Sequence, residues 1–472
     1  MSRISEHVGR VWDDQVLPTL TDYIRIPALS PAFDPDWKAH GHLDEAVRLL
    51  SGWAAARLGP GASLEVIELA GRSPVIWLEF ASSDGASGPE ADTVLLYGHL
   101  DKQPEMAGWR EGLGPWTPVR DGDRLYGRGG ADDGYALFAA IAALEAVVAA
   151  GGRHARAVVL IEASEESGSP DLPAYIEALA GRIGTPSLVV ALDSGCGDYE
   201  RLWLTTSLRG LAAGVLSVAT TTHGVHSGSY GGVLPSTFRI ARRLLDRVED
   251  SATGEVLVAA ANVAIPEDRL RQAERTAEVL GGYAEELPVL AGVDVVGGRS
   301  VAELLVDKAW RPSLEVIGAD GLPPSATAGN VLRARTALAL SLRLPPTADP
   351  VDAREALGRA LTADPPYGAL VEFEAHEAAP GWAAPSLGSW LSSAVDESSR
   401  HRFGNDSAFI GEGGTIPFMG MLGERFPEAQ FLITGVLGPE SNAHGPNEFL
   451  HVPMAKKLTE CVADLLIAHA GR

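Results

Sequence analysis

Carboxylate and imidazole side chains recur in loops and at the ends of apolar, strand-like segments of this 472-residue chain: His99, Asp101, Asp132, Glu165, Glu166, Asp193 and His444. Two divalent cations bound there would carry four positive charges. Asp132, Glu166 and Asp193 would supply three negative charges, and a hydroxide bridging the metals would supply the fourth. His99 and His444, when neutral, would each give one metal a nitrogen ligand. The set therefore predicts a dinuclear hydrolytic centre.

The remaining carboxylates suggest a division of roles. Asp132 precedes an apolar, helix-like segment over 135–150 and could cap that helix. Beside the other ligands it is better interpreted as a bridge, which would hold two metals about 3.5–4 Å apart. Asp101 follows His99 by two residues, a spacing that suits a carboxylate accepting the other ring N–H. Glu165 is not needed for charge balance and could move a proton between water and a leaving nitrogen.

Mixed nitrogen and oxygen ligands also narrow the choice of metal. They suit Zn²⁺, while Mn²⁺ and Co²⁺ would fit as well. We therefore expect two divalent ions of the Zn²⁺ type.

Charge and composition exclude several classes of partner. The chain has 62 acidic and 38 basic residues and a net charge of −24, which opposes binding to nucleic acid and to anionic membranes. No apolar run has the roughly 20 residues that a membrane span needs. The polar start of the sequence lacks the apolar core of a secretory signal. Only two cysteines occur, Cys196 and Cys461, far apart, so we expect a cytoplasmic protein without a structural disulfide.

Strand-like and helix-like segments alternate through the first part of the chain. The sequence predicts strands and helices over 93–97, 135–150, 157–162, 172–179 and 188–192. This alternation predicts an α/β fold with a mixed, mostly parallel sheet and helices on both faces. Ligands bind beyond the carboxyl ends of such strands, where His99, Glu165, Glu166 and Asp193 are expected.

The pattern changes in the middle of the chain. Strand-rich segments and two helix-like segments over 236–248 and 351–361 indicate a smaller α+β unit. We therefore predict one domain from residues 1–207 and 381–472, with 208–380 inserted into it.

Five short motifs occur in the order found in one known family: Gly98-His99-Leu100-Asp101, Gly129-Gly130-Ala131-Asp132-Asp133, Glu165-Glu166-Ser167-Gly168, Leu192-Asp193 and Asn442-Ala443-His444-Gly445. The chain resembles the dinuclear zinc exopeptidases and amidohydrolases, which include carnosinase, cytosolic non-specific dipeptidase, glutamate carboxypeptidases and N-acyl amino acid deacylases. The resemblance implies a zinc exopeptidase-like catalytic domain and an inserted lid and dimerisation domain. It implies the metal ligands His99, Asp132 (bridging), Glu166, Asp193 and His444. It also implies Glu165 as general base and Asp101 as the orienting carboxylate.

The insertion resembles the family at substrate-binding positions. The motif around His226 is similar to the lid motif whose histidine polarises the scissile carbonyl, from the other subunit in dimeric members. Asn330 resembles the asparagine that supports the carbonyl, and Arg343 resembles the arginine that holds a substrate carboxylate. Gly414 and Thr415 lie in a Gly-Gly-Thr-Ile-Pro run similar to the loop that binds the substrate C-terminus.

These features predict a dimetal hydrolase that cleaves the amide bond of dipeptides or small peptides with a free C-terminal carboxylate, using a metal-bridging water activated by Glu165. A homodimer formed through the insertion is implied. An N-acyl amino acid deacylase of the same chemistry is the alternative, because Gly411 stands where dipeptidases of the family often carry arginine. A non-catalytic metal-binding or peptide-binding relative would have lost the base or a ligand, and here Glu165 and all five ligands are present.

Overall fold

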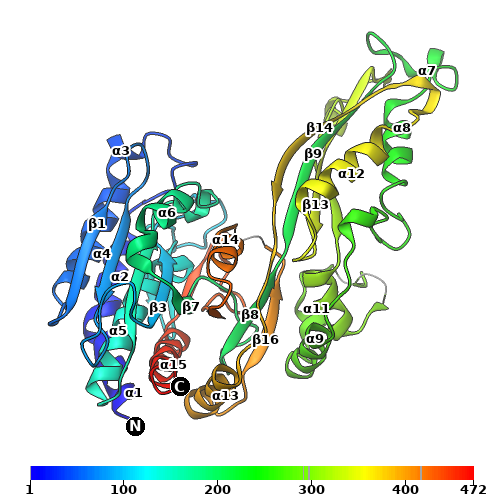
Figure 1. The fold of residues 1–472 in the computed structure, drawn as a ribbon. Coiled ribbons are helices and arrows are strands. Elements are labelled where there is room, and N and C mark those ends of the chain that lie inside the picture. The colour runs from blue at the N-terminus through cyan, green and yellow to red at the C-terminus, as the bar shows by residue number, and fades with distance from the viewer. Residues whose placement is uncertain (1, 291, 296–297, 415–416) are drawn as a thin grey trace. The chain divides into compact units, whose positions relative to one another are not determined.

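A computed structural model describes residues 2–290, 292–295, 298–414 and 417–472 (Figure 1). The chain forms two compact units. Unit 1 comprises Met1–Thr206, Ala384–Ile410 and Met421–Arg472, and unit 2 comprises Ser207–Ala383 and Gly411–Gly420. The segment 411–420, which was predicted to belong to the domain formed by residues 1–207 and 381–472, therefore groups with unit 2. No helix in the described ranges is long and apolar enough to cross a membrane.

Unit 1 is built on a six-stranded sheet of order β1-β2-β6-β3-β7-β17. Its strands are β1 (Ala62–Ile67), β2 (Val75–Phe80), β3 (Thr93–His99), β6 (Arg156–Glu162), β7 (Pro186–Ala191) and β17 (Gln430–Ile433). Strands β6, β3, β7 and β17 pair in parallel, whereas β2 pairs in the antiparallel sense with both of its neighbours, β1 and β6. This confirms the predicted mixed, mostly parallel sheet.

Helices cover both faces of this sheet. Side chains of a strand alternate between faces, and every residue of β3 and β6 is buried, so neither face is open to water. The helical segments are α1 (Arg3–Val11), η1 (Trp12–Val16), α2 (Leu17–Ile24), α3 (Trp37–His40), α4 (His42–Ala55), η2 (Gly130–Gly134), α5 (Ala136–Ala149), η3 (Glu165–Ser167), α6 (Leu172–Ile183), α13 (Ser389–Phe403) and α15 (Val452–Ala470). Helix α14 (Pro417–Arg425) begins in unit 2 and ends in unit 1. Helix α5 is apolar nearly all round, is buried except towards its C-terminal end, and packs against α1 and α15.

Two small sheets complete the frame. One has the order β18-β5-β4, from β4 (Val119–Asp121), β5 (Arg124–Tyr126) and β18 (Phe449–His451). The other joins β8 (Trp203–Leu208), β15 (Trp382–Ala383) and β16 (Ala408–Glu412), the strands in which the chain passes from one unit to the other.

Unit 2 has a four-stranded antiparallel sheet of order β11-β13-β9-β14. Its strands are β9 (Gly210–Ala219), β11 (Ser313–Asp320), β13 (Arg335–Leu344) and β14 (Leu370–Ala379). Helices α8 (Thr237–Leu245) and α12 (Pro350–Thr362) pack their apolar sides on this sheet, with Leu244 and Leu357 fully buried. The predicted α+β unit with two helices on its sheet is thus confirmed.

The rest of unit 2 lies beside this core. A two-stranded ladder joins β10 (Val225–His226) to β12 (Val331–Leu332). The remaining helical segments are α7 (Ser227–Tyr230), η4 (Ala259–Ala261), α9 (Glu267–Val279), α10 (Tyr283–Glu286), α11 (Val301–Trp310), η6 (Ser325–Thr327) and η7 (Pro366–Gly368). Helix α11 was not predicted, although a capping box of Ser300 and Glu303 marks its start.

Gly98 shows how tightly the end of β3 is packed against α5. A Cβ at this position would lie 2.5 Å from the Ala136 Cβ and 2.7 Å from Asp133 Oδ2. We therefore expect Gly98→Ala to lower the free energy of unfolding by about 1–3 kcal/mol, because a buried contact becomes overpacked. Urea unfolding followed by circular dichroism measures the change.

Gly52→Ala in α4 is the matched control, because a Cβ at Gly52 has no heavy atom within 4 Å. Alanine is preferred to glycine in a helix, so this change should leave stability equal or raise it by up to about 1 kcal/mol. Equal effects at the two positions would contradict the packing argument.

Candidate metal centre

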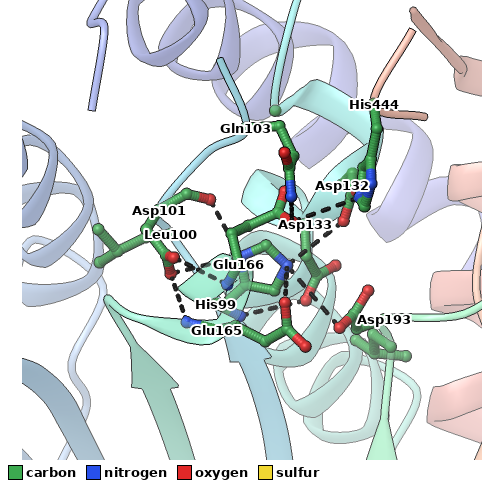
Figure 2. Close-up of polar contacts among 12 residues, drawn as sticks. His99, Leu100, Asp101, Gln103, Asp132, Asp133, Glu165, Glu166, Asp193 and His444 are labelled. Atoms are coloured by element: carbon green, nitrogen blue, oxygen red, sulfur yellow. Dashed lines mark hydrogen bonds and ion pairs between the residues drawn. The ribbon is translucent and has the colours of Figure 1, made fainter. Parts of the chain in front are cut away.

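The sheet brings four of the predicted side chains to one edge (Figure 2). His99 is the last residue of β3, and Glu165 and Glu166 lie in η3 after β6. Asp193 lies just beyond the end of β7. Because β3, β6 and β7 are neighbouring parallel strands, their carboxyl ends meet at the same edge.

Asp132 reaches this edge from the turn before α5. Its backbone is not helical, with φ −122° and ψ 89°, and α5 begins after Tyr135 without a side-chain cap. Asp132 therefore does not cap α5. The turn instead aims its carboxylate at the strand ends.

His99 lies at the centre of the carboxylates and is fully buried. Its Nε2 is 3.3 Å from Asp132 Oδ1, 3.7 Å from Asp193 Oδ2 and 3.9 Å from Glu165 Oε2. Among the described residues, none gives this Nε2 a well-formed hydrogen bond. A buried nitrogen without a hydrogen-bond partner, surrounded by carboxylate oxygens, fits a metal ligand.

His444 forms a second group on the other side of Asp132. Its Nε2 is 3.1 Å from Asp132 Oδ2 and 3.3 Å from Glu166 Oε2. Asp132 thus turns one oxygen to each histidine, which is the arrangement that a bridging carboxylate requires. The His444 side chain is 56% exposed, whereas that of His99 is 0% exposed.

Asp101 has a different set of contacts from the one that its spacing predicts. His99 Nδ1 lies 3.1 Å from the backbone oxygen of Asp101 and 3.6 Å from its carboxylate Oδ1. The carbonyl oxygen can only accept, so Nδ1 carries the proton and Nε2 presents its lone pair. The Asp101 carboxylate accepts the backbone N–H groups of Glu165 and Glu166, at 3.1 and 3.0 Å. It therefore also fixes the turn that carries the expected base and a ligand.

Two neighbouring residues were missed by sequence reasoning. Gln103 Nε2 donates to Glu166 Oε2 at 2.7 Å, so it orients the same oxygen that faces His444. Asp133 Oδ2 accepts the backbone N–H of His99 at 3.2 Å. Both residues adjoin a motif, but neither contact follows from spacing alone.

Burial and crowding change the pKa of each group. Burial, and then the charge of Asp193, raise the pKa of Glu165 well above its usual range. Burial, opposed by His99, raises the pKa of Asp193 to about 6. Burial would also raise the pKa of Asp132, but its contacts with the two histidines lower it. The cluster therefore holds more negative charge than its surroundings stabilise, a condition that a divalent cation relieves.

The predicted substrate residues lie in unit 2. His226 ends β10 opposite Val331 of β12, and the backbone oxygen of Asn330 accepts the N–H of Ser227 at 2.9 Å. His226 and Asn330 are therefore brought close together by this ladder. His226 is exposed, and its Nδ1 accepts the N–H of Gly228 at 3.1 Å.

Arg343 and the glycine-rich run lie elsewhere in unit 2. Arg343 is on β13. The burial of Arg209, together with the positive charge of Arg343, lowers the pKa of Arg209 to about 10. Gly414 is exposed, while Thr415 lies outside the described residues.

Comparison with known proteins identifies the family. The model of peptidase family M20/M25/M40 matches residues 95–211, and that of the peptidase dimerisation domain matches residues 206–368. The chain therefore carries the peptidase domain and the dimerisation domain of this family. It is therefore a metallopeptidase-type hydrolase, and the predicted resemblance is confirmed.

Named relatives extend the likeness over most of the chain. It is 29% identical to a cysteinylglycine-S-conjugate dipeptidase of Corynebacterium striatum, over 78% of this chain and 80% of the relative. It shares the fold of an M20 metallo-carboxypeptidase from Sulfolobus solfataricus (TM-score 0.77, 22% identity, covering 97% and 100%). It also shares the fold of the dipeptidase Dug1p from Saccharomyces cerevisiae (TM-score 0.75, 22% identity, 100% of both chains).

The raised pKa values predict how this M20 centre responds to pH. A carboxyl group with a raised folded pKa loses stability as the pH rises through that pKa, because the folded state gives up a proton that it held tightly. For Asp193 this loss falls between the ordinary aspartate pKa, near 4, and its folded pKa of about 6. We therefore expect metal-stripped protein to melt progressively below Zn²⁺-loaded protein as the pH rises from about 4 to about 6.

Melting temperatures of both forms across this pH range, at matched ionic strength, test the expectation. The difference between the two should widen with pH. A constant difference would mean that the cluster does not exchange protons for metal.

Proposed function

We propose that this M20 chain is a dinuclear metal-dependent dipeptidase. The observation that carries the proposal is the position of Asp132, whose two oxygens face two different histidines while Glu165 remains beside His99. Groups of His99 with Asp132 and Glu166, and of His99 with Glu165 and Asp193, have ligand atoms within 4.8 Å of one another.

Five residues of unit 1 would hold the metals: His99, Asp132, Glu166, Asp193 and His444. Their mixed nitrogen and oxygen donors fit two Zn²⁺ ions, and Mn²⁺ or Co²⁺ would also suit them. When bound, such ions polarise a carbonyl group and make water acidic enough to act as a nucleophile near neutral pH.

Glu165 would act as general base and then as general acid. Its raised pKa suits a group that must take a proton from water and return it to the leaving nitrogen. Its backbone N–H is held by the Asp101 carboxylate, so the turn cannot swing away from the site. This contact positions the backbone of Glu165 and leaves the Glu165 carboxylate available to accept a proton.

Substrate binding would fall to unit 2. Arg343, with Gly414 and Thr415, would hold the free carboxylate of a dipeptide, because a guanidinium fork binds carboxylate bidentately. His226 would donate a hydrogen bond to the carbonyl oxygen as negative charge develops there, and Asn330 would support it.

A dipeptide is favoured over an N-acyl amino acid by the named relatives. The Corynebacterium striatum relative is a dipeptidase, and so is a mouse relative, a beta-Ala-His dipeptidase that is 27% identical over 73% of this chain and 70% of the relative. A deacylase would use the same base and metals. We also propose a cytoplasmic location, because the chain is strongly acidic and its two cysteines are buried.

A hydrolysis assay tests the function. We expect the Zn²⁺-, Mn²⁺- or Co²⁺-loaded protein to cleave members of a dipeptide panel and to leave N-acetyl amino acids intact. Glu165→Gln should lower kcat by about 10²–10⁴-fold, because the proton acceptor is lost. The metal content of this variant should not change.

Glu177→Gln on the exposed side of α6 is the control and should behave as wild type. Release of acetate with inert dipeptides would replace the dipeptidase by the deacylase. No turnover with any of the metals would favour a binding protein.

The match to a peptidase dimerisation domain supports a homodimer in which His226 serves the partner's active site. If so, mixing inactive Glu165→Gln and His226→Ala proteins should restore up to about one quarter of wild-type activity. Half of randomly exchanged dimers are hybrids, and each hybrid has one complete site of two. Co-purification of untagged chains with an affinity-tagged variant confirms exchange, and hybrids without activity would exclude action across the dimer.

A further inference from the structure

The loop that carries His444 has an unusual backbone. Several of its non-glycine residues have a positive φ: Glu440 at 62°, Asn442 at 55°, His444 at 63° and Asn447 at 62°. Such conformations are unfavourable for L-residues and persist only where surrounding contacts impose them. Something must therefore hold this loop in place.

A buried ion pair lies directly beneath the loop. The side chains of Arg128 and Glu448 are 1% and 0% exposed, and Arg128 Nη1 donates to Glu448 Oε2. Arg128 Nη2 also donates to the backbone oxygen of Gly445, the residue after His444, at 2.9 Å. Glu448 Oε1 accepts the backbone N–H of Gly129 at 2.8 Å.

Each member of the pair therefore also bonds to the backbone beside the other member. Arg128 lies in the segment that leads to Asp132, and it donates to the backbone next to His444. Glu448 lies in the segment that carries His444, and it accepts from the backbone of the segment that leads to Asp132. The antiparallel pairing of β5 with β18 holds these two segments of the chain in register, with Tyr126 opposite Phe449.

His444 depends on this backbone more than the other histidine does. Its ring is more than half exposed and contacts the carboxylates of Asp132 and Glu166. His99, in contrast, is fixed within β3 and fully buried. The position of His444 relative to Asp132 must therefore come from the loop.

We propose that Arg128 and Glu448 are a positioning pair for His444, and that they set the affinity of the metal held between His444, Asp132 and Glu166. The proposal rests on the dinuclear centre proposed above. A buried ion pair is a costly way to gain stability, but its guanidinium fork can fix a carboxylate and a carbonyl oxygen at the same time. Apolar packing offers no such directional hold.

A second buried arginine provides a matched control. Arg156 begins β6, at the end of the strand opposite the metal centre, and its side chain is 1% exposed. It pairs with Glu79 at 2.8 Å and donates to the backbone oxygens of Arg182 and Ile183 at 2.7 and 3.0 Å. Its chemistry is the same, but it holds no loop with a proposed ligand.

The experiment titrates metal-stripped wild type, Arg128→Met and Arg156→Met with Zn²⁺ in a calorimeter, and counts bound zinc after dialysis. Wild type should bind two ions per chain. Arg128→Met should keep one ion at wild-type affinity and bind the other about 10- to 100-fold more weakly, the usual effect of losing a group that orients a ligand. Arg156→Met should melt at a lower temperature yet still bind two ions as wild type does.

Glu448→Gln is the second variant, and it decides the matter if Arg128→Met does not fold. Its amide oxygen can still accept from Gly129, but the ion pair with Arg128 is gone. Two ions at wild-type affinity in a folded variant, or equal weakening of both ions, would overturn the positioning role. Wild type that binds no Zn²⁺ would instead overturn the metal centre itself.

Discussion

The crowding of carboxylates around one buried imidazole is the constraint on which the rest of the catalytic unit depends. Oxygens of Asp132, Asp193 and Glu165 lie 3.3–3.9 Å from His99 Nε2, in a place that water reaches poorly. Like charges in such surroundings repel one another strongly, so the acids hold protons or need cations. The fold maintains this arrangement because the strands that carry the ligands are locked into the central sheet.

The surrounding structure shows how such a cluster is held. Buried acids that are not proposed ligands act as anchors for the turns that carry the ligands. Asp101 accepts two backbone N–H groups of η3 from one side. Glu162 accepts the hydroxyls of Tyr97, Ser164 and Ser169 from the other, at 2.6, 3.2 and 2.8 Å. The turn with Glu165 is thus fixed by hydrogen bonds to two buried carboxyl groups.

Much of this architecture could be predicted because it follows from local pattern. Apolar runs ending in His99 or preceding Asp193 indicate buried parallel strands, and motif order identifies the family. The four-residue strand β17 was missed, because so short a run at a sheet edge has little periodicity. Helix α11 was also not predicted, although the capping box at its start is visible in the sequence as Ser300 followed by Glu303.

Contacts made across the fold were harder to predict. Spacing suggested that the Asp101 carboxylate would accept from His99, whereas the backbone carbonyl lies closer and the carboxylate holds η3. Gln103 reaches Glu166 only because β3 and β6 are neighbours. Arg128 and Glu448 are 320 residues apart, and no sequence pattern around either residue indicates that they pair. Side-chain direction and strand order decide such pairs, and a single sequence specifies neither directly.

The two sides of the centre consequently differ in how they are prepared. His99 is buried in a strand, and its ordering is part of folding the sheet. His444 is exposed on a loop whose backbone is unfavourable by itself, so its ordering must come from Arg128, Glu448 and any bound cation. A ligand on a rigid strand binds metal with little further loss of entropy, whereas a ligand on a held loop can adjust as substrate arrives. Within unit 1, therefore, the His99 side of the centre is closed and rigid, whereas the His444 side is open to solvent and would be the side from which substrate reaches Asp132.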